Sequence, residues 1–574
     1  MKLRKGAALL APAVVLIMGA AACGGSSDSG NGSSNGGTKT GGRLIYGYET
    51  KFPGNLFPLI SAGNSVATAY MEVRVMPSPT QYTPDFKVVR DPELLTSDPT
   101  SETKNGKQVV TYHLNPKAVW SDGQPLDAKD FIFSWKLQRS SDPADGGCAD
   151  LIGTTGYDQI DSVEGSDSDK TVTITFKTPY SDWLSLYNGQ LFPAHTMDKG
   201  DPKANCAVIK AGWPTAGGIP VSAGPWNIEK ANVDSGKQVI TLTPNKNYWG
   251  TKPKLDQLIY QAIGNEAGVN VKALKSGEVQ MIYPQPQLDL VKNIKALEPN
   301  VSSKISFGLS FEHLDFNTRN AALKDVAIRK AIATAINRED LVKATVGQFD
   351  NRASVLNNRM YVTNQPQYED TSGGAYDKAD VAKAKQMIEG AGYKLGADGI
   401  YAKGGVKLSF DTITTVQNPL REQTIDVLAS QLKPAGIEIR KDLDPDIFED
   451  KSKPKSLEAG GFDIALFAWV GSPFVSGSVS IYQSVKGDSQ GQNYTHGNDP
   501  KVDDLLKQMT QETDPTKQAS LANQADTQLW ANLFTLPLYQ KPTFLAWDTN
   551  YTGIDENATN SGPLWNSEKF ARKA

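Results

Sequence analysis

The stretch Phe462-Asp-Ile-Ala-Leu-Phe-Ala-Trp-Val-Gly-Ser-Pro473 contains an unbroken apolar run, residues 464–468, that stops at Gly471 and Pro473. A continuous run of this length is typical of a strand covered on both faces, as in a parallel or mixed sheet flanked by helices. Trp469 follows the run directly. Ligands of open α/β sheets bind beyond the strand ends. Trp469 is therefore either a wall of a ligand site or a core residue that closes the end of a sheet.

The length and composition of the chain indicate how many domains it has and which kinds of binding partner it lacks. A chain of 574 residues is too long for one hydrophobic core, which predicts two or more domains. Charged residues make up 21% and the net charge is −4, so nothing favours binding to nucleic acid. The four histidines and three cysteines are scattered, which argues against a zinc or copper site. We expect no nucleic-acid partner, no metal site and no cofactor.

The N-terminus is typical of an exported protein. Residues 1–22 combine a basic start with an apolar stretch too short for a comfortable transmembrane helix, which predicts a signal peptide. The following Gly19-Ala-Ala-Ala-Cys-Gly-Gly25 resembles a bacterial lipobox, with Ala20 where Leu is usual. We expect a lipidated Cys23, the alternative being ordinary cleavage beside a stray cysteine. Residues 23–42 form a flexible tether because they are rich in Gly, Ser, Asn and Thr. These features predict a protein anchored to the outer face of the cell membrane.

Export leaves two further cysteines, Cys148 and Cys206. In an oxidising compartment two remaining thiols most often pair. Closing a loop of that length would contribute about 4 kcal/mol on the chain-entropy estimate. We therefore predict a disulfide, and two unpaired buried thiols are the alternative.

The segment Trp120-Ser-Asp-Gly-Gln-Pro-Leu-Asp-Ala-Lys-Asp-Phe-Ile-Phe-Ser-Trp135 combines a turn with the start of a helix. Its Ser-Asp-Gly-Gln portion has turn chemistry, since Asp bonds locally and Gly supplies positive φ. Asp127 can cap the helix while Asp130 reaches back, a capping-box arrangement. Residues 107–114 upstream alternate as a strand does. The sequence therefore predicts a strand, a turn and a capped helix.

The same segment is similar to the signature of the peptide/nickel (family 5) solute-binding proteins of ABC importers, with Asp127 where Thr is usual. Further segments resemble that family in the same order along the chain: Ser222-Ala-Gly-Pro-Trp226, Asn245-Lys-Asn-Tyr-Trp-Gly250, Lys275-Ser-Gly-Glu-Val-Gln280, Leu314-Asp-Phe-Asn-Thr318, and residues 324–338, 376–393, 432–439 and 535–539. The ordered series covers nearly all of the exported chain and is far more specific than any one motif. By this resemblance the chain is identified as a member.

The resemblance implies an α/β fold of the periplasmic-binding-protein type. It consists of two α/β lobes joined by a hinge of two crossing segments, with a third, smaller domain inserted in the first lobe. The implied divisions are residues 43–76, 191–307 and 539–574 for lobe I, 77–190 for the inserted domain and 308–538 for lobe II. A Cys148–Cys206 disulfide would then join the inserted domain to lobe I.

Such a fold implies capture of a peptide or peptide-like solute by hinge closure and its delivery to a membrane permease. No bond is made or broken, so we expect no enzyme, and we expect a monomer. A secreted hydrolase is a rival, but the sequence has no Gly-x-Ser-x-Gly and no His-Glu-x-x-His motif; a glycosidase carboxylate pair stays open. A receptor that signals without uptake would share the whole pattern.

The resemblance also implies ligand contacts from both lobes. The residues expected to contact the ligand are Trp469 first, Ser472 second, and then Phe311, His313, Tyr283, Gln285 and Tyr539. For each residue other than Trp469, a packing role is the open alternative.

Ser472 bears on the kind of ligand. Oligopeptide-binding members carry an Asp three residues after the Trp, where it pairs with the free amino terminus of the peptide. A charge-assisted hydrogen bond is about twice as strong as a neutral one, so Ser472 should weaken the binding of ordinary peptides. We therefore expect a ligand other than a short peptide with a free amine, or one that is held differently.

Overall fold

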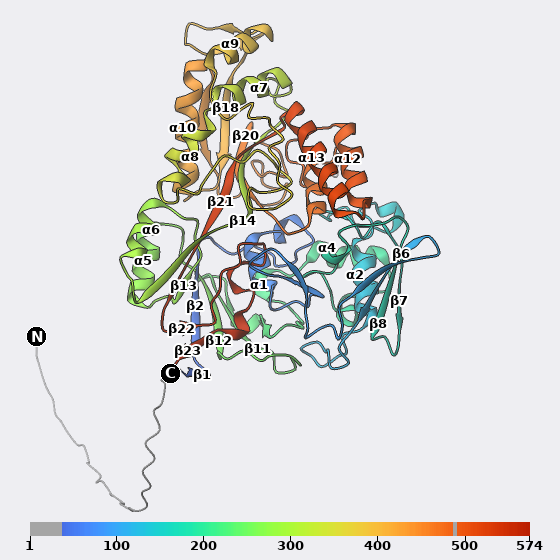
Figure 1. The fold of residues 1–574 in the computed structure, drawn as a ribbon. Coiled ribbons are helices and arrows are strands. Elements are labelled where there is room, and N and C mark those ends of the chain that lie inside the picture. The colour runs from blue at the N-terminus through green and yellow to red at the C-terminus, as the bar shows by residue number, and fades with distance from the viewer. Residues whose placement is uncertain (1–36, 486–490) are drawn as a thin grey trace, which may run out of the picture. The chain divides into compact units, whose positions relative to one another are not determined.

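Two long antiparallel strands, β14 (Val301–Phe316) and β21 (Thr535–Asp548), form the middle of the largest sheet (Figure 1). The computed structural model describes residues 37–485 and 491–574. The expected signal peptide, Cys23 and most of the tether therefore lie outside the described residues. In spatial order, the sheet consists of β10 (Val233–Asp234), β11 (Val239–Pro244), β12 (Gln257–Ala262), β2 (Arg43–Tyr48), β13 (Met281–Ile282), β21, β14, β20 (Ile464–Val470), β18 (Ser409–Thr414) and β19 (Glu438–Leu443), with β9 (Trp226–Asn227) beside β11.

The large sheet has two halves joined by β14 and β21. We call the strands from β10 to β13 the first half and β20, β18 and β19 the second half. Parallel pairs occur in both halves, since β2 lies between β12 and β13 and β18 lies between β19 and β20. The pairs that include β14 or β21 are antiparallel. The sheet is therefore mixed, as expected for this α/β fold.

Strand β20 confirms the prediction of a strand covered on both faces. Ile464 and Leu466 belong to a buried cluster that includes residues of the helices around the second half. Ala465 and Phe467 belong to a different cluster, which packs against the loop residues Ile447, Leu457 and Phe462. The unbroken apolar run is needed because successive side chains of the strand enter different cores.

The helices beside the large sheet follow local sequence signals. They are α5 (Ala267–Ser276), α6 (Leu288–Lys295), α7 (Val326–Ala335), α8 (Arg338–Ala344), α9 (Val381–Gly390), α10 (Pro419–Leu432), α12 (Pro500–Gln511) and α13 (Pro515–Asn532). Asp325 caps α7, and residues 324–338 do not form one helix. The backbone at Ile336 is extended, and the Asn337 side chain accepts a hydrogen bond from the Asp340 N–H, which starts α8.

A separate four-stranded antiparallel sheet has the order β5 (Thr100–Lys104), β6 (Lys107–His113), β8 (Thr171–Phe176) and β7 (Ile160–Ser166). Helix α2 (Ala128–Gln138) lies beside it (Figure 1). The predicted capping box of α2 is confirmed, since Asp127 and Asp130 each accept a hydrogen bond from the backbone near the other. Cys148 and Cys206 form a disulfide, as predicted.

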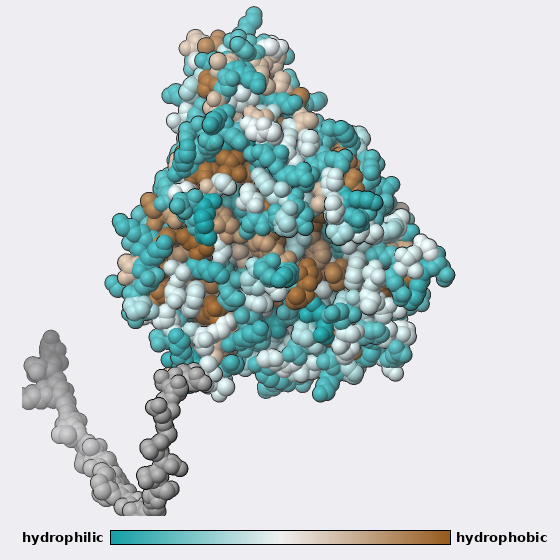
Figure 2. All heavy atoms as spheres, in the orientation of Figure 1, coloured by the Kyte–Doolittle hydropathy of each residue, from teal (hydrophilic) through white to brown (hydrophobic). Residues whose placement is uncertain are grey.

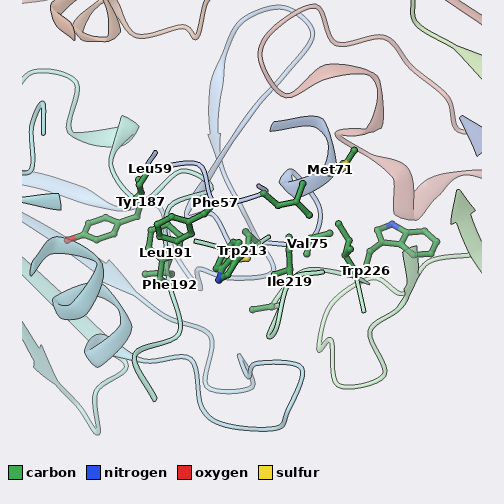
Figure 3. Close-up of a cluster of buried hydrophobic side chains, with 14 of the residues drawn as sticks. Phe57, Leu59, Met71, Val75, Tyr187, Leu191, Phe192, Trp213, Ile219 and Trp226 are labelled. Carbon is green, nitrogen blue, oxygen red and sulfur yellow. The ribbon is translucent and has the colours of Figure 1, made fainter. Parts of the chain in front are cut away.

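One hydrophobic core joins this part of the chain to the first half of the large sheet. Figure 3 shows Phe57, Phe192 and Trp213 together at its centre, and each pair of these rings is 5.0–5.8 Å apart between centroids. The same core contains Tyr46 from β2 and Ile174 from β8. Because the packing is continuous, the divisions of the inserted domain at 76/77 and 190/191 stay predictions.

The remaining elements are short. They are α1 (Val66–Glu72), α3 (Ala194–Met197), α4 (Pro202–Ala211), α11 (Val479–Tyr482), and the strands β1 (Thr38–Lys39), β3 (Thr80–Tyr82), β4 (Val88–Arg90), β15 (Lys394–Leu395), β16 (Tyr401–Lys403), β17 (Val406–Lys407), β22 (Tyr551–Thr552) and β23 (Ala571–Lys573). Figure 2 shows hydrophilic residues over much of the visible face, with hydrophobic patches among them. Within the described residues, no helix has the length and apolar character needed to span a membrane.

Candidate functional site

The pairing of β14 with β21 is irregular between Phe307 and Phe311, where the two halves of the sheet meet. Leu309 donates its N–H to the Ala558 carbonyl (3.2 Å) and accepts at its own carbonyl from the Gly471 N–H (3.0 Å). At Gly308, an added Cβ would lie 1.8 Å from the Ala558 oxygen, so a side chain does not fit there. Strands β14 and β21 therefore lie close to the loop after β20 and to residue 558 at this point.

An aromatic wall stands beside this point. We use that name for Phe311, His313, Phe467, Trp469 and Tyr494. Phe311 is the register partner of Trp469, and the His313 ring lies 5.5 Å from Phe311 and 4.2 Å from Phe467 between centroids. The Trp469 indole stacks nearly parallel on His313 (5.9 Å, 8°) and on Tyr494 (5.8 Å, 12°). Three of the expected ligand residues, Phe311, His313 and Trp469, are thus brought together.

Polar atoms of the wall lack partners. His313 is fully buried, and neither of its ring nitrogens has a hydrogen-bond partner among the described residues. The same is true of the buried Trp469 Nε1. The nearest acid to His313 is Asp315, whose Oδ1 lies 3.6 Å from Nε2, beyond ordinary hydrogen-bond distance. Buried donors without partners are uncommon in folded proteins.

Ser472 lies in the loop that follows the wall. Its hydroxyl accepts a long hydrogen bond from the Phe474 N–H (3.4 Å), and the Phe474 ring contacts Tyr82 (5.9 Å between centroids). Ser472 thus shares the end of β20 with Trp469, and the loop it belongs to reaches a residue of the predicted inserted domain.

Gln285 and Tyr539 lie in a second, charged group. The side-chain oxygen Oε1 of Gln285 accepts from Asn418 Nδ2 (2.9 Å), and the Gln285 backbone N–H donates to Glu49 Oε2 (2.7 Å). Asn418 also caps α10. These bonds connect the carboxyl ends of β2 and β13 with the start of a helix of the second half.

The centre of the charged group is an ion pair between Glu312 Oε1 and Arg421 Nε (2.5 Å). Glu312 is the register partner of Tyr539. Burial lowers the pKa of the neighbouring Lys541, and the charge of Glu312 partly offsets that effect. Sequence reasoning missed Glu312 and Arg421.

Tyr283 lies in a third place. Its ring contacts Tyr70 at 6.0 Å between centroids. Glu556, close by, accepts hydrogen bonds from the hydroxyls of Ser306 and Thr543, and burial raises the pKa of its carboxyl. No sequence signal pointed to Glu556. The seven expected ligand residues therefore do not form one cluster.

Residues 180–182 of the predicted inserted domain make direct contact with the second half. Tyr180 Oη donates to Ser476 Oγ (2.9 Å), and the Ser181 N–H donates to the Thr510 carbonyl (2.9 Å). Asp182 accepts from the Ser476 N–H (2.8 Å) and from Gln518 Nε2 (2.9 Å). We call this set of bonds the latch. It holds Ser476, which lies four residues after Ser472.

Potential metal ligands gather at one place in the described part of the chain. The one cluster of potential ligand atoms there that is close enough to hold an ion is Cys148, Asp150 and Cys206, and its two sulfur atoms are bonded to each other.

Comparisons with known proteins agree on one family. Residues 91–492 match the family described as "Bacterial extracellular solute-binding proteins, family 5 Middle". The oligopeptide-binding protein OppA of Mycobacterium tuberculosis is 28% identical over 503 residues, 87% of this chain and 80% of its own. The oligopeptide-binding protein AppA of Bacillus subtilis is 26% identical over 468 residues, 78% of each chain.

Solved structures give the same fold. The periplasmic EDTA-binding protein EppA superposes with a TM-score of 0.81 and 26% identity, covering 94% of this chain and 98% of its own. Bacillus subtilis AppA in complex with a nonapeptide superposes with a TM-score of 0.78 and 22% identity, covering 93% and 100%.

Proposed function

Since the chain belongs to family 5 of the bacterial extracellular solute-binding proteins, we propose that it captures a peptide or peptide-like solute by hinge closure and hands it to a membrane permease. Members of this family are extracytoplasmic binding proteins of importers for peptides or related solutes, and they are not enzymes. The match spans most of the folded chain, which makes it the observation that carries the proposal.

The irregular pairing of β14 with β21 supports a hinge between the two halves. A hinge needs a few residues that change their backbone angles while the strands on either side stay rigid. The segment from Phe307 to Phe311 has this character, because β14 pairs with β21 up to Phe307 and again from Phe311, but not regularly in between. The latch, in turn, supports a closed arrangement that opens by breaking hydrogen bonds rather than a hydrophobic core.

The names of the relatives leave the ligand open. OppA and AppA are named for oligopeptides, and EppA for EDTA. Ser472 stands where peptide binders carry an acid, so our proposal keeps a ligand other than a short peptide with a free amine. Tight, sequence-tolerant binding of mixed tri- to pentapeptides in isothermal titration would contradict that part.

The main test is to identify what the protein carries. The purified protein is denatured, and the released small molecules are identified by mass spectrometry and titrated back onto ligand-free protein. Spin labels at the exposed Lys246 and Lys394 then report closure as a shorter, narrower distance distribution when the ligand is present. Ligand binding without any change in that distance contradicts hinge closure. An uptake assay separates an importer from a receptor that only signals.

We also propose a lipid anchor at Cys23 and a monomeric protein. A Cys23→Ser variant should pass from the membrane fraction to the culture medium, whereas the unchanged chain should stay with the membrane. Light scattering on the chain from residue 38 should give the mass of one copy. A wild-type protein found free in the medium contradicts the anchor.

A further inference from the structure

The Trp469 indole packs among three other rings of the wall. His313 and Tyr494 both lie nearly parallel to it, at 5.9 and 5.8 Å between ring centroids. Phe467 meets it edge-on at 5.1 Å. The indole Nε1 is buried and has no partner in the described part of the chain.

His313 repeats the pattern on the neighbouring strand. It is fully buried, and in every protonation state at least one of its ring nitrogens carries a hydrogen that finds no acceptor within the described residues. By contrast, nearby polar side chains are well bonded. Asn317 donates to the Gly460 and Phe462 carbonyls (2.9 and 2.7 Å), and Gln540 donates to the Gly308 carbonyl (2.7 Å). The donors of His313 and Trp469 therefore lie side by side in the wall without partners, although they are not the chain's only buried polar atoms of this kind.

The chemistry of these groups selects the kind of atom they can bind. An indole N–H donates and cannot accept. Two acids near the wall already accept hydrogen bonds: Asp315 accepts at Oδ1 from the Thr535 hydroxyl (2.6 Å), and both oxygens of Asp182 accept from the latch. Ser472 brings only a hydroxyl. An ammonium group would meet these donors and the Ser472 hydroxyl, whereas an oxygen acceptor would meet the N–H groups it needs.

We infer that the ligand presents an acceptor oxygen, of a carboxylate or an amide carbonyl, to Trp469 Nε1 and His313, and that it carries no free ammonium at this end. The inference rests on the proposed function, because it takes the wall to be part of the ligand cleft. It adds the chemical class of the end of the ligand that reaches the wall.

The test uses two probes on the full folded chain. One is a library of tri- to pentapeptides, prepared with free and with N-acetylated amino termini. The other is whatever co-purifies with the wild-type protein. Retention is measured by native mass spectrometry for wild type, Trp469→Phe, Ser472→Asp and Trp565→Phe. Trp469→Phe keeps an aromatic ring and removes the N–H. Trp565→Phe makes the same change far along the chain, where the N–H donates to the Asp555 carbonyl (3.1 Å).

We expect the wild type to retain N-acetylated peptides at least as well as free ones. Trp469→Phe should lose about tenfold in retention, or about 1.4 kcal/mol of binding, whereas Trp565→Phe should lose none. Ser472→Asp should gain retention of free-amine peptides only. The inference is overturned if wild-type retention requires the free amine, or if Trp469→Phe retains as much as wild type. If no peptide is retained and nothing co-purifies, the proposed function itself fails, and the inference with it.

Discussion

Two kinds of buried polar side chain flank β14 and β21. Arg359 is fully buried, and its guanidinium reaches Asp526 (3.0 Å) and the Thr535 carbonyl (2.6 and 3.0 Å) while it lies over the Trp530 ring (4.2 Å). His313 is buried and Trp469 is partly buried, and neither the His313 ring nitrogens nor Trp469 Nε1 has a hydrogen-bond partner among the described residues. The arginine therefore serves the fold, because its bonds are complete without a ligand. The wall is incomplete by itself, which is the pattern expected of a binding surface.

The largest expected effect comes from breaking the complete group. Asp526→Ala leaves the buried Arg359 charge unpaired, and removal of one partner of a buried ion pair costs about 3–5 kcal/mol. We expect a loss of that size in urea denaturation. Asp504→Ala, an exposed acid that accepts only from Gln508 (2.7 Å), is the matched control and should change little. If both variants lost the same stability, the buried ion pair of Asp526 would contribute no more than an exposed acid does.

His496 extends the comparison to pH. Its two ring nitrogens have no partner among the described residues, and burial lowers the pKa of His496 to about 4. The unfolded chain binds this proton near pH 6.5 and the folded chain only near pH 4, so stability falls as the pH drops through that window. Since the ring is partly exposed, we expect a loss of about 1–2 kcal/mol.

The check is a series of denaturation curves from pH 7 to pH 4. His496→Asn should flatten the dependence, and Asn also tolerates the positive φ of 54° at this position. His113→Gln is the control, because His113 is exposed on β6. A slope that survives His496→Asn would assign the proton to another group.

Structural features that depend on residues close together in sequence were predictable, whereas the boundaries of longer elements were not. The capping box of Asp127 and Asp130 and the strand at β20 depend on residues close together in sequence, and both predictions are confirmed. Residues 324–338 are divided between α7 and α8, because the extended backbone at Ile336 and the cap at Asn337 separate the two helices. Gly277 ends α5, and the strand that follows, β13, covers only Met281 and Ile282.

The candidate site was predictable only in part, for a geometric reason. Phe311, His313 and Trp469 meet because antiparallel pairing of β14 with β20 places them side by side. Tyr539 could not be placed from sequence, because the face that each residue takes is set by the irregular pairing before Phe311 and after Glu312. The ion pair of Glu312 spans 109 residues of sequence, beyond the reach of any motif.

A smaller effect is expected at the latch. Asp182→Asn replaces a charged acceptor with an amide that can accept on one side only, so the bond from either the Ser476 N–H or Gln518 weakens. Hydrogen bonds to charged groups contribute about 1.5–3 kcal/mol, and part of that is regained from water when the latch opens. We expect the closed form to lose about 1 kcal/mol relative to the open form. The distribution of distances between spin labels at Lys177 and Lys394 should then become longer and broader. The exposed Asp145→Asn is the control. An unchanged distribution would mean that the latch does not hold the closed form.

The smallest expected effect is on the stability of Trp469→Phe. It compares the Arg359 group with the wall directly, because the same Trp→Phe substitution can be made in both. Trp530 Nε1 donates to the Asn357 carbonyl (3.3 Å) and to Thr371 Oγ1 (3.2 Å), and its ring supports the Arg359 charge. Trp530→Phe should therefore cost about 2 kcal/mol of stability. Trp469→Phe loses ring contacts but also removes a buried donor that has no partner, and these two changes oppose each other.

We expect Trp469→Phe to stay within about 0.5 kcal/mol of wild type in the ligand-free protein. Urea denaturation of both variants, side by side, measures the difference. If Trp469→Phe costs as much as Trp530→Phe, the indole N–H is already satisfied in the free protein, and the wall belongs with the arginine as part of the fold. If it costs nearly nothing while ligand retention falls, the same N–H is unused in folding and used in binding.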